Sequence, residues 1–489
     1  MRVFIFGIGG TGSRVLRSLT MLLASGVKIN QKALTVIPIV IDTDAHNGDT
    51  SRTRDVLRNY YTIRKNFVNK TVNSESDSFF NTEIRSFNRL DEKAPDSADL
   101  DVQFNFQNQD NTFANFINYN ALSQPNKDMI ELFYNDSVNQ FPELHLNLSV
   151  GFKGNPNIGS VVFNDLKYSQ QFKNLESSFT ANDRVFIISS IFGGTGSSGF
   201  PTLVKLIRTS TNNNLAKTKI GAITVMPYFN VESNDKSAIN SAIFDTKTKA
   251  ALSFYSGDTH ISSINSLYYI ADNNQPGSLP NVEGGVDQIN NAHVIELISA
   301  TAIIDFLNTD DATLESPRCL EFGSESDGSP FTIAQFTNDT KEKYIKPLTK
   351  FAYATKIGTD FIPTLSNETF YGPKELNIDS ALGMQGEYNK LMEFFEGFKT
   401  WSTTEMGSAN NGRAFNSFNF EGSDNVNTLV HGKTIEAGIF DKGLSKKKVA
   451  AKLTSSEVGL PKDMAIPEKY LTMLYETSCY CLDEFGQLP

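Results

Sequence analysis

Apolar residues near the start of the chain form short continuous runs, each followed by a glycine-rich or polar stretch. Val3–Phe6 and Thr35–Ile41 are the first two runs, and Val185–Ile188 and Ile220–Val225 are later ones. Runs that are apolar at every position are typical of strands in a parallel sheet covered on both faces. Between the first two runs, leucines recur at helical spacing as far as Gly26. The order strand, loop, helix, strand predicts an α/β fold with a Rossmann-like parallel sheet.

The pattern changes in two later regions. Residues 50–148 are rich in Asn, Asp, Ser and Phe and lack strong β runs, which predicts a mostly helical insertion with surface loops. Apolar residues lie on nearly every face of 290–307, so we expect a central helix that is buried all round. We therefore expect a first domain over 1–289, the central helix over 290–308 and a divergent C-terminal α+β domain over 309–489. Within that last domain the pattern predicts strands over 331–336 and 434–440 and helices over 386–399 and 467–485.

Composition narrows the classes of protein that fit. The 489 residues carry a net charge of −11, which argues against bulk binding to nucleic acid. Three cysteines give no disulfide framework, and neither they nor the five histidines form a metal-binding motif. No apolar run approaches the roughly 20 residues needed to span a bilayer. We expect a soluble cytoplasmic protein without a membrane span.

The first glycine loop, Gly7–Ser13 with the sequence GIGGTGS, lies between a predicted strand and a predicted helix. Glycines let backbone N–H groups approach a phosphate, and the helix N-terminus adds a favourable dipole. Alone, the loop also fits a Rossmann dinucleotide site with Asp42 or Asp44 as the ribose-binding acid. It is similar as well to the opening of ubiquitin-activating-type adenylyltransferases.

A second glycine loop, Ser190–Gly199, again follows an apolar run and precedes an apolar helix. A simple dinucleotide fold has one such loop, and two loops indicate a phosphate chain held from two sides. Thr195, Ser197 and Ser198 add hydroxyl donors to this second loop. The pair therefore favours a nucleotide site.

The second loop also carries a family resemblance. FGGTGSSGFP at 192–201 resembles the tubulin/FtsZ signature GGGTGTGAAP, with Phe192 and Ser198 as departures. GIGGTGS resembles the first phosphate loop of that superfamily. DTDAH at 42–46 resembles its NTDAQ loop, with Asp42 in place of the asparagine. The five resembling segments occur in the superfamily's order and cover about 1–45 and 150–310.

The remaining segments complete the resemblance. GFKGNPNIG at 151–159 is similar to the loop that wraps the terminal phosphate, and FNVE at 229–232 is similar to FNFE, whose glutamate reaches the ribose. Lys236 stands where FtsZ proteins place a basic residue near the sugar and base. Asn291 matches the base-reading asparagine, with Asn290 or Ala292 as alternatives if the register slips.

The resemblance implies a protein that binds GTP or GDP with Mg²⁺ and assembles into filaments or oligomers. In the superfamily an acid after the central helix positions the hydrolytic water in the neighbouring subunit's site, within the pattern NxDxxD. Asn308 and Asp310 fit that pattern, and the second acid is displaced. The implied nucleotide-binding residues are Gly9, Gly10, Thr11, Gly12, Asp42, Asp44, Gly154, Asn155, Gly193, Gly194, Thr195, Gly196, Ser197, Glu232, Lys236 and Asn291.

Two alternatives remain open. A nucleotide-sensing scaffold would bind GTP without efficient hydrolysis and recruit protein partners through 50–148 and the C-terminal half. The departures at Asp42, at Phe192 and in the acids after the central helix motivate this alternative. A dinucleotide or ATP enzyme would use the first loop and leave the second unexplained. The basic side chains of 52–65 are interpreted as a solvated helix face, with partner docking as the alternative: Arg52, Arg54, Arg58, Arg64 and Lys65.

Overall fold

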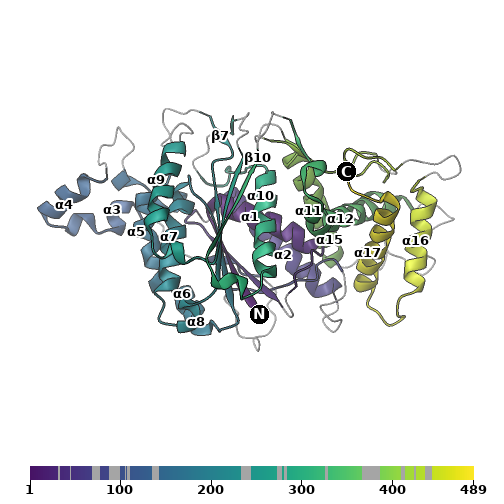
Figure 1. The fold of residues 1–489 in the computed structure, drawn as a ribbon, viewed down its shortest axis with the longest axis horizontal. Coiled ribbons are helices and arrows are strands. Elements are labelled where there is room, and N and C mark those ends of the chain that lie inside the picture. Colours follow the sequence, from purple (N-terminus) through teal and green to yellow (C-terminus); the bar gives the residue numbers. More distant parts are fainter. Residues whose placement is uncertain are drawn as a thin grey trace.

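A computed structural model gives the structure of the chain. It contains a parallel sheet with helices on both faces, as the apolar runs predict (Figure 1). The structure describes residues 1–489 apart from 31–33, 45, 69–77, 88–99, 105, 107–110, 135–142, 233–243, 273–277, 280–283, 325–328, 366–385, 409–412, 423–425 and 436–442.

The central sheet has eight strands in the order β10-β8-β6-β5-β1-β2-β3, with β4 pairing with β2 beside β3. Every pairing is parallel, so the carboxyl ends of the strands lie along one edge. The continuous apolar runs are explained by their burial, since every residue of β2, β5 and β6 is buried. The strands are β1 Arg2–Ile8, β2 Thr35–Ile41, β3 Glu83–Ile84, β4 Gln103–Phe104, β5 Arg184–Ser190, β6 Ile220–Val225, β8 Ser266–Asp272 and β10 Arg318–Ser324.

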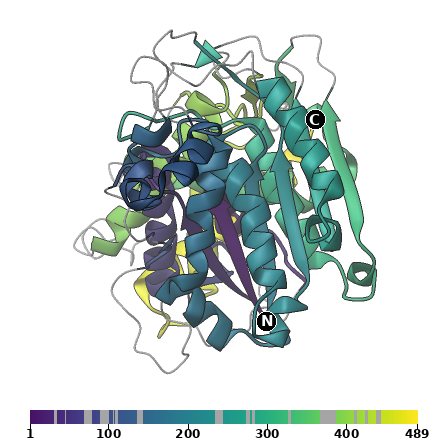
Figure 2. The same ribbon diagram turned by 90° about the vertical axis from the view of Figure 1, so that its left-hand side faces the viewer.

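Helices cover both faces of this sheet. On one face, α1 lies between the sheet, α2 and α10, and it is buried on nearly every side (Figure 1). The opposite face is covered by α5, α7 and α9, and this side faces the viewer in Figure 2. The bounds are α1 Gly9–Ala24, α2 Gly48–Phe67, α5 Pro156–Phe163, α6 Gln170–Ser178, α7 Gly194–Arg208, α8 Asn213–Ala216, α9 Phe244–Gly257 and α10 Val294–Asn308.

The central helix, α10, is buried over most of its surface, as its apolar sequence predicts. It begins at Val294, four residues after the predicted start, because His293 and Glu296 form a capping box that sets the N-terminus of the helix. His293 accepts a hydrogen bond at Nδ1 from the backbone N–H of Ile295, and the Glu296 carboxylate accepts one from the N–H of His293.

The segment 50–148 is more closely integrated into the fold than an insertion would be. Most of α2 belongs to it, and α2 packs against α1 and the C-terminal helices. Strands β3 and β4, two residues each, extend the main sheet. They are too short to show an alternating pattern in the sequence. Among the described residues of this segment, α3 Phe113–Phe116 and α4 Gln124–Glu131 project from the body of the protein (Figure 1).

The C-terminal segment divides differently from the predicted boundary at 309. Its first strand, β10, completes the main sheet, and the helices α12, α15, α16 and α17 form a group beside α2. The strand expected over 331–336 is two residues long and turns into a 3₁₀ helix, whereas most of 434–440 lies outside the described residues. The helices of this segment are α11 Asn338–Thr340, α12 Lys346–Lys356, α13 Ile362–Leu365, α15 Gly386–Thr400, α16 Lys446–Val458 and α17 Ile466–Phe485. Its two short strands, β11 Phe331–Thr332 and β12 Phe415–Asn416, pair with each other. Earlier in the chain, β7 Asn230–Val231 pairs with β9 Ser278–Leu279.

The lengths and hydropathy of the helices show whether any of them could span a membrane. None of those in the described part of the chain is both long enough and apolar enough to cross a bilayer.

Candidate functional site

A cavity opens at the carboxyl edge of the sheet, beyond the ends of β1, β2 and β5. Ligand sites of open α/β sheets lie at this edge. Both glycine loops line the cavity, and two further segments complete its wall. The lining segments are Gly9–Thr11, Val150–Gly154, Phe192–Gly196 and Asp287–Asn290.

The glycines of the three loops allow the loops to touch each other. A side chain on Gly9, where φ is +70°, would place its Cβ 3.3 Å from the Cβ of Thr195. A Cβ on Gly194 would lie 3.0 Å from the backbone N of Gly154. Glycine is therefore required for the close approach of backbone to backbone. Because α1 and α7 begin in these loops, their free N–H groups and dipoles make the cavity suited to an anion such as a phosphate.

Two buried acids, Asp42 and Asp44, line the same cavity from the end of β2. The Asp44 carboxylate accepts hydrogen bonds from the N–H of Gly285 at 2.5 Å and of His46 at 3.1 Å. Asp42 accepts one from the N–H of Asp44 at 3.1 Å. Burial, with a smaller contribution from the Asp44 carboxylate, raises the pKa of Asp42 to about 7. Asp42 can therefore be neutral or charged near physiological pH.

Arg14 is a cavity residue that the sequence did not indicate. Its guanidinium is buried and donates to Glu296 Oε1 at 2.6 Å and to Asp49 Oδ2 at 2.6 Å. It also donates to the hydroxyl of Tyr228 at 2.6 Å and to that of Thr11 at 3.3 Å. Buried ion pairs of this kind position groups firmly, since removing one partner costs about 3–5 kcal/mol. Through the contact of Arg14 with Thr11, the first glycine loop is joined to a network of buried ion pairs.

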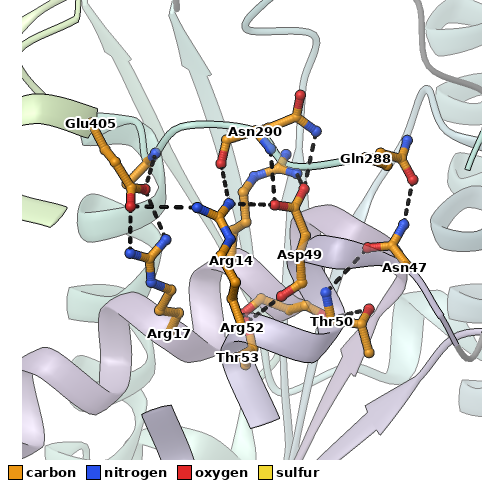
Figure 3. A network of polar contacts seen from close by, with 12 residues as sticks. Arg14, Arg17, Asn47, Asp49, Thr50, Arg52, Thr53, Gln288, Asn290 and Glu405 are labelled. Atoms are coloured by element: carbon orange, nitrogen blue, oxygen red, sulfur yellow. Dashed lines mark hydrogen bonds and ion pairs between the residues drawn. The ribbon is translucent and has the colours of Figure 1, made fainter. Parts of the chain in front are cut away.

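This network continues through Asp49 to the segment before α10 (Figure 3). Asp49 accepts hydrogen bonds from both the backbone N–H and the side-chain amide of Asn290, each at 3.0 Å. Arg52 donates to Asp49 and to the carbonyl oxygen of Asn290. The prediction that Arg52 belongs to a solvated helix face is therefore wrong, because its partners are buried and its side chain is only 27% exposed.

The C-terminal helical group joins the network at Glu405. This carboxylate pairs with Arg17 at 2.6 Å and with Arg52 at 3.4 Å (Figure 3). It also accepts a hydrogen bond from the backbone N–H of Ala292 at 2.9 Å. The segment before α10 is consequently held by α2 on one side and by the C-terminal helices on the other.

The predicted base-reading position lies one residue from the residue that lines the cavity. Asn290 lines the cavity and Asn291 does not. The anchoring of Asn290 by Asp49 fixes this register. No sequence signal separates two adjacent asparagines, so only the tertiary contacts identify the one that faces the cavity.

Most of the other predicted nucleotide-binding residues lie in the cavity wall, and four of the described ones do not. Gly12 packs against the backbone of β1, Asn155 precedes α5, and the Ser197 hydroxyl donates to a carbonyl of its own loop. Glu232 is exposed and does not line the cavity, while Lys236 lies outside the described residues. The predicted residues that line the cavity are Gly9, Gly10, Thr11, Asp42, Asp44, Gly154, Gly193, Gly194, Thr195 and Gly196.

The two predicted catalytic residues lie at the opposite edge of the sheet. The helix α10 has 15 residues and therefore separates its two ends by roughly 22 Å. At its far end, the Asn308 amide oxygen accepts a hydrogen bond from the N–H of Asn30 at 2.8 Å. Asp310 is exposed and accepts from the N–H and hydroxyl of Thr313. Neither residue reaches the cavity of its own chain.

An aromatic wall and a lysine complete the cavity. Phe192, which departs from the signature, packs with ring centroids 5.5 Å from Phe229 and 5.0 Å from Phe244. All three rings line the cavity together with Lys247 of α9. The sequence shows Phe192 only as a departure from the glycine-loop signature. Lys247 belongs to no motif that the sequence analysis identified.

These features define an α/β domain with a cavity at the carboxyl edge of a parallel sheet, suited in its backbone and helix dipoles to an anion. Comparison with known families gives a match over part of the chain. Residues 160–243 match the family described as "Tubulin like", and this segment includes the second glycine loop and the FNVE segment. The match confirms the resemblance to the tubulin/FtsZ superfamily, in a divergent form.

Among solved structures, the chain is similar to CetZ2 from Haloferax volcanii in a GTPγS-bound protofilament. The two chains share 11% sequence identity with a TM-score of 0.30, and the similarity covers 64% of this chain. It spans 61% of the CetZ2 chain. No curated protein sequence matches.

Proposed function

We propose that this protein binds GTP or GDP with Mg²⁺ in the cavity and assembles with copies of itself in a nucleotide-dependent way. The observation that carries the proposal is the meeting of three glycine-containing loops at one cavity. A single Rossmann dinucleotide loop does not require the second and third loops. The match of 160–243 to a tubulin-like family supports guanine nucleotide over other ligands.

The phosphates would lie against Gly9–Thr11 and Gly193–Gly196, where backbone N–H groups are available. Mg²⁺ prefers oxygen ligands and usually binds through one or two carboxylates, phosphates and water. Asp44 and the hydroxyl of Thr11 are oxygen donors of the cavity that fit such an ion. When bound, the ion would neutralise charge on the phosphates. Asn290 would contact the base from the segment before α10.

Assembly would join the two edges of the sheet. Because Asn308 and Asp310 lie at the edge opposite the cavity, they can act on a nucleotide only in a neighbouring subunit. A subunit stacked edge to edge on another would bring its Asp310 toward the neighbour's terminal phosphate. There the carboxylate would orient a water molecule for hydrolysis.

A second candidate is a scaffold that binds GTP and recruits partners without efficient hydrolysis. Two contacts favour it. The Asp310 carboxylate already accepts two hydrogen bonds from Thr313, and Asp311 pairs with Arg184 at 2.9 Å. An acid that is engaged within its own chain is less available to a water molecule.

Sedimentation and GTP turnover at several protein concentrations test the two candidates together. The assembling protein should pellet with Mg²⁺-GTP and not with Mg²⁺-GDP, and its turnover per subunit should rise with concentration. Asp310→Ala should retain binding and lose about one-hundredfold in turnover. Unchanged turnover in Asp310→Ala, with no pelleting of the wild type, would leave the scaffold as the better account.

A further inference from the structure

A partly buried ammonium group lies where the second and third loops meet. Lys247 belongs to α9 and lines the cavity. Its Nζ donates a hydrogen bond to the carbonyl oxygen of Gly154 at 2.7 Å. Gly154 in turn lies against Gly194, as the 3.0 Å separation from a Cβ at that glycine shows. Lys247 therefore touches the junction of two loops whose backbones face the cavity.

Among the described residues, partly buried Lys247 has no carboxylate partner. Burial lowers the pKa of its ammonium group. An ammonium group has three N–H donors, and the Gly154 carbonyl uses one. Removing a charge from water is unfavourable unless it is paired. The remaining donors thus indicate an anion supplied by a ligand.

The acids of the cavity do not fill this role. The Asp44 carboxylate accepts from the backbone of Gly285 and His46, and Asp42 accepts from the N–H of Asp44. These bonds hold the Asp44 carboxylate against Gly285 and His46, and the Asp42 carboxylate against the backbone of Asp44. The positive charge of Lys247 is therefore available to a bound anion.

A series of contacts along the cavity wall leads from Asn290 to Lys247. Asn290 is bonded to Asp49, whose carboxylate lies 3.7 Å from a Cβ built on Gly10. From the first loop the wall continues through the contact of Gly9 with Thr195 to the second loop. The second loop then meets Gly154, and Gly154 meets Lys247. A nucleotide with its base at Asn290 would extend its phosphate chain toward Lys247.

We propose that Lys247 binds the terminal phosphate of the nucleotide and gives the cavity a preference for triphosphate over diphosphate. The inference rests on the proposed binding of guanine nucleotide. The contact is made within one chain, so the preference exists before any assembly. Its physical basis is a charge-assisted hydrogen bond that only the third phosphate can complete.

The test compares the affinities of Mg²⁺-GTPγS and Mg²⁺-GDP for monomeric protein, measured by calorimetry. Lys247→Met removes the charge, Lys247→Arg keeps it, and Lys249→Met changes an exposed lysine of the same helix. We expect Lys247→Met to lose about tenfold to one-hundredfold in GTPγS affinity and less than about threefold in GDP affinity. Lys247→Arg should retain most of the preference, and Lys249→Met should match the wild type.

Each outcome bears on the inference. An unchanged ratio of GTPγS to GDP affinity in Lys247→Met overturns it, and so does an equal loss for both nucleotides. Normal GDP binding shows that the variant is folded, and Lys247→Gln replaces it if Lys247→Met does not fold. Failure of the wild type to bind either nucleotide instead contradicts the proposed function, so the two failures are distinguishable.

Discussion

The two ends of α10 differ in almost every physical respect. At the N-terminal end, Glu296 is buried and pairs with Arg14, which also pairs with the buried Asp49. At the C-terminal end, Asn308 and Asp310 lie at the surface and contact neighbouring turns. The first end pairs with Arg14 of the cavity wall, whereas the second forms part of an outer surface.

In the proposed assembly, this difference would let one helix serve two subunits. Charges that are buried and paired hold a fixed geometry, which suits a site that binds phosphates. Exposed polar side chains remain accessible, which suits a surface that meets another copy. The same helix joins the cavity end to the end that carries Asn308 and Asp310. Its length of roughly 22 Å therefore fixes the distance between these two regions.

The largest expected effect comes from breaking the charge network at the cavity end. Asp49→Ala removes the partner of Arg14, Arg52 and Asn290 together. We expect a loss of about 3–5 kcal/mol in the free energy of unfolding, because buried Arg14 keeps only Glu296 as a carboxylate partner and the N–H groups of Asn290 lose their acceptor. Urea denaturation followed by circular dichroism measures the change.

The matched control lies at the other end of α10. Asp311 pairs with Arg184, but its side chain is 76% exposed. Asp311→Ala should therefore stay within about 1 kcal/mol of the wild type. Equal effects of the two substitutions would remove the distinction between the ends.

A second effect concerns the pH dependence of the cavity. Because burial raises the pKa of Asp42 to about 7, the folded state holds a proton that the unfolded state has lost. The contribution of Asp42 to stability is therefore present below about pH 4 and is lost as the pH rises through about 7. Asp42→Asn stays neutral, so its stability relative to the wild type should increase between pH 5 and pH 8 by up to about 3 kcal/mol. Thermal unfolding across this range gives the measurement, and parallel curves for the two proteins would contradict it.

A smaller effect distinguishes the two adjacent asparagines. Asn290→Ala should reduce the preference for GTP over ATP by about tenfold to one-hundredfold, since a hydrogen bond to the base is lost. Asn291→Ala serves as the control and should keep the preference, because Asn291 does not line the cavity. Competition binding with both nucleotides measures the selectivity. The reverse result would restore the register predicted from the sequence.

The parts that the sequence predicted are those with strong local patterns. The unit from β1 through the first loop and α1 to β2, the second glycine loop and the buried α10 all follow from apolar runs and glycines. Helices α15 and α17 lie within one residue of their predicted bounds. By contrast, β3 and β4 are two residues long and leave no alternating pattern to detect.

The unpredicted residues of the site are mostly charged side chains. In a sequence, Arg14, Arg52 and Lys247 look like ordinary exposed residues of helices. The two arginines are paired with Glu296, Asp49 and Glu405, and Lys247 donates to the carbonyl oxygen of Gly154 in another loop. Such pairings arise only when α1, α2 and α10 pack together, so no local pattern reports them.

The most direct test of the account is equilibrium binding of GTP to the purified protein, with ATP and NAD as competitors. The account predicts saturable Mg²⁺-dependent binding of GTP that neither competitor displaces at equal concentration. Displacement of GTP by NAD or ATP, or the absence of GTP binding, would contradict it. In that case the glycine loops would have kept the fold of a guanine-nucleotide site and lost its ligand.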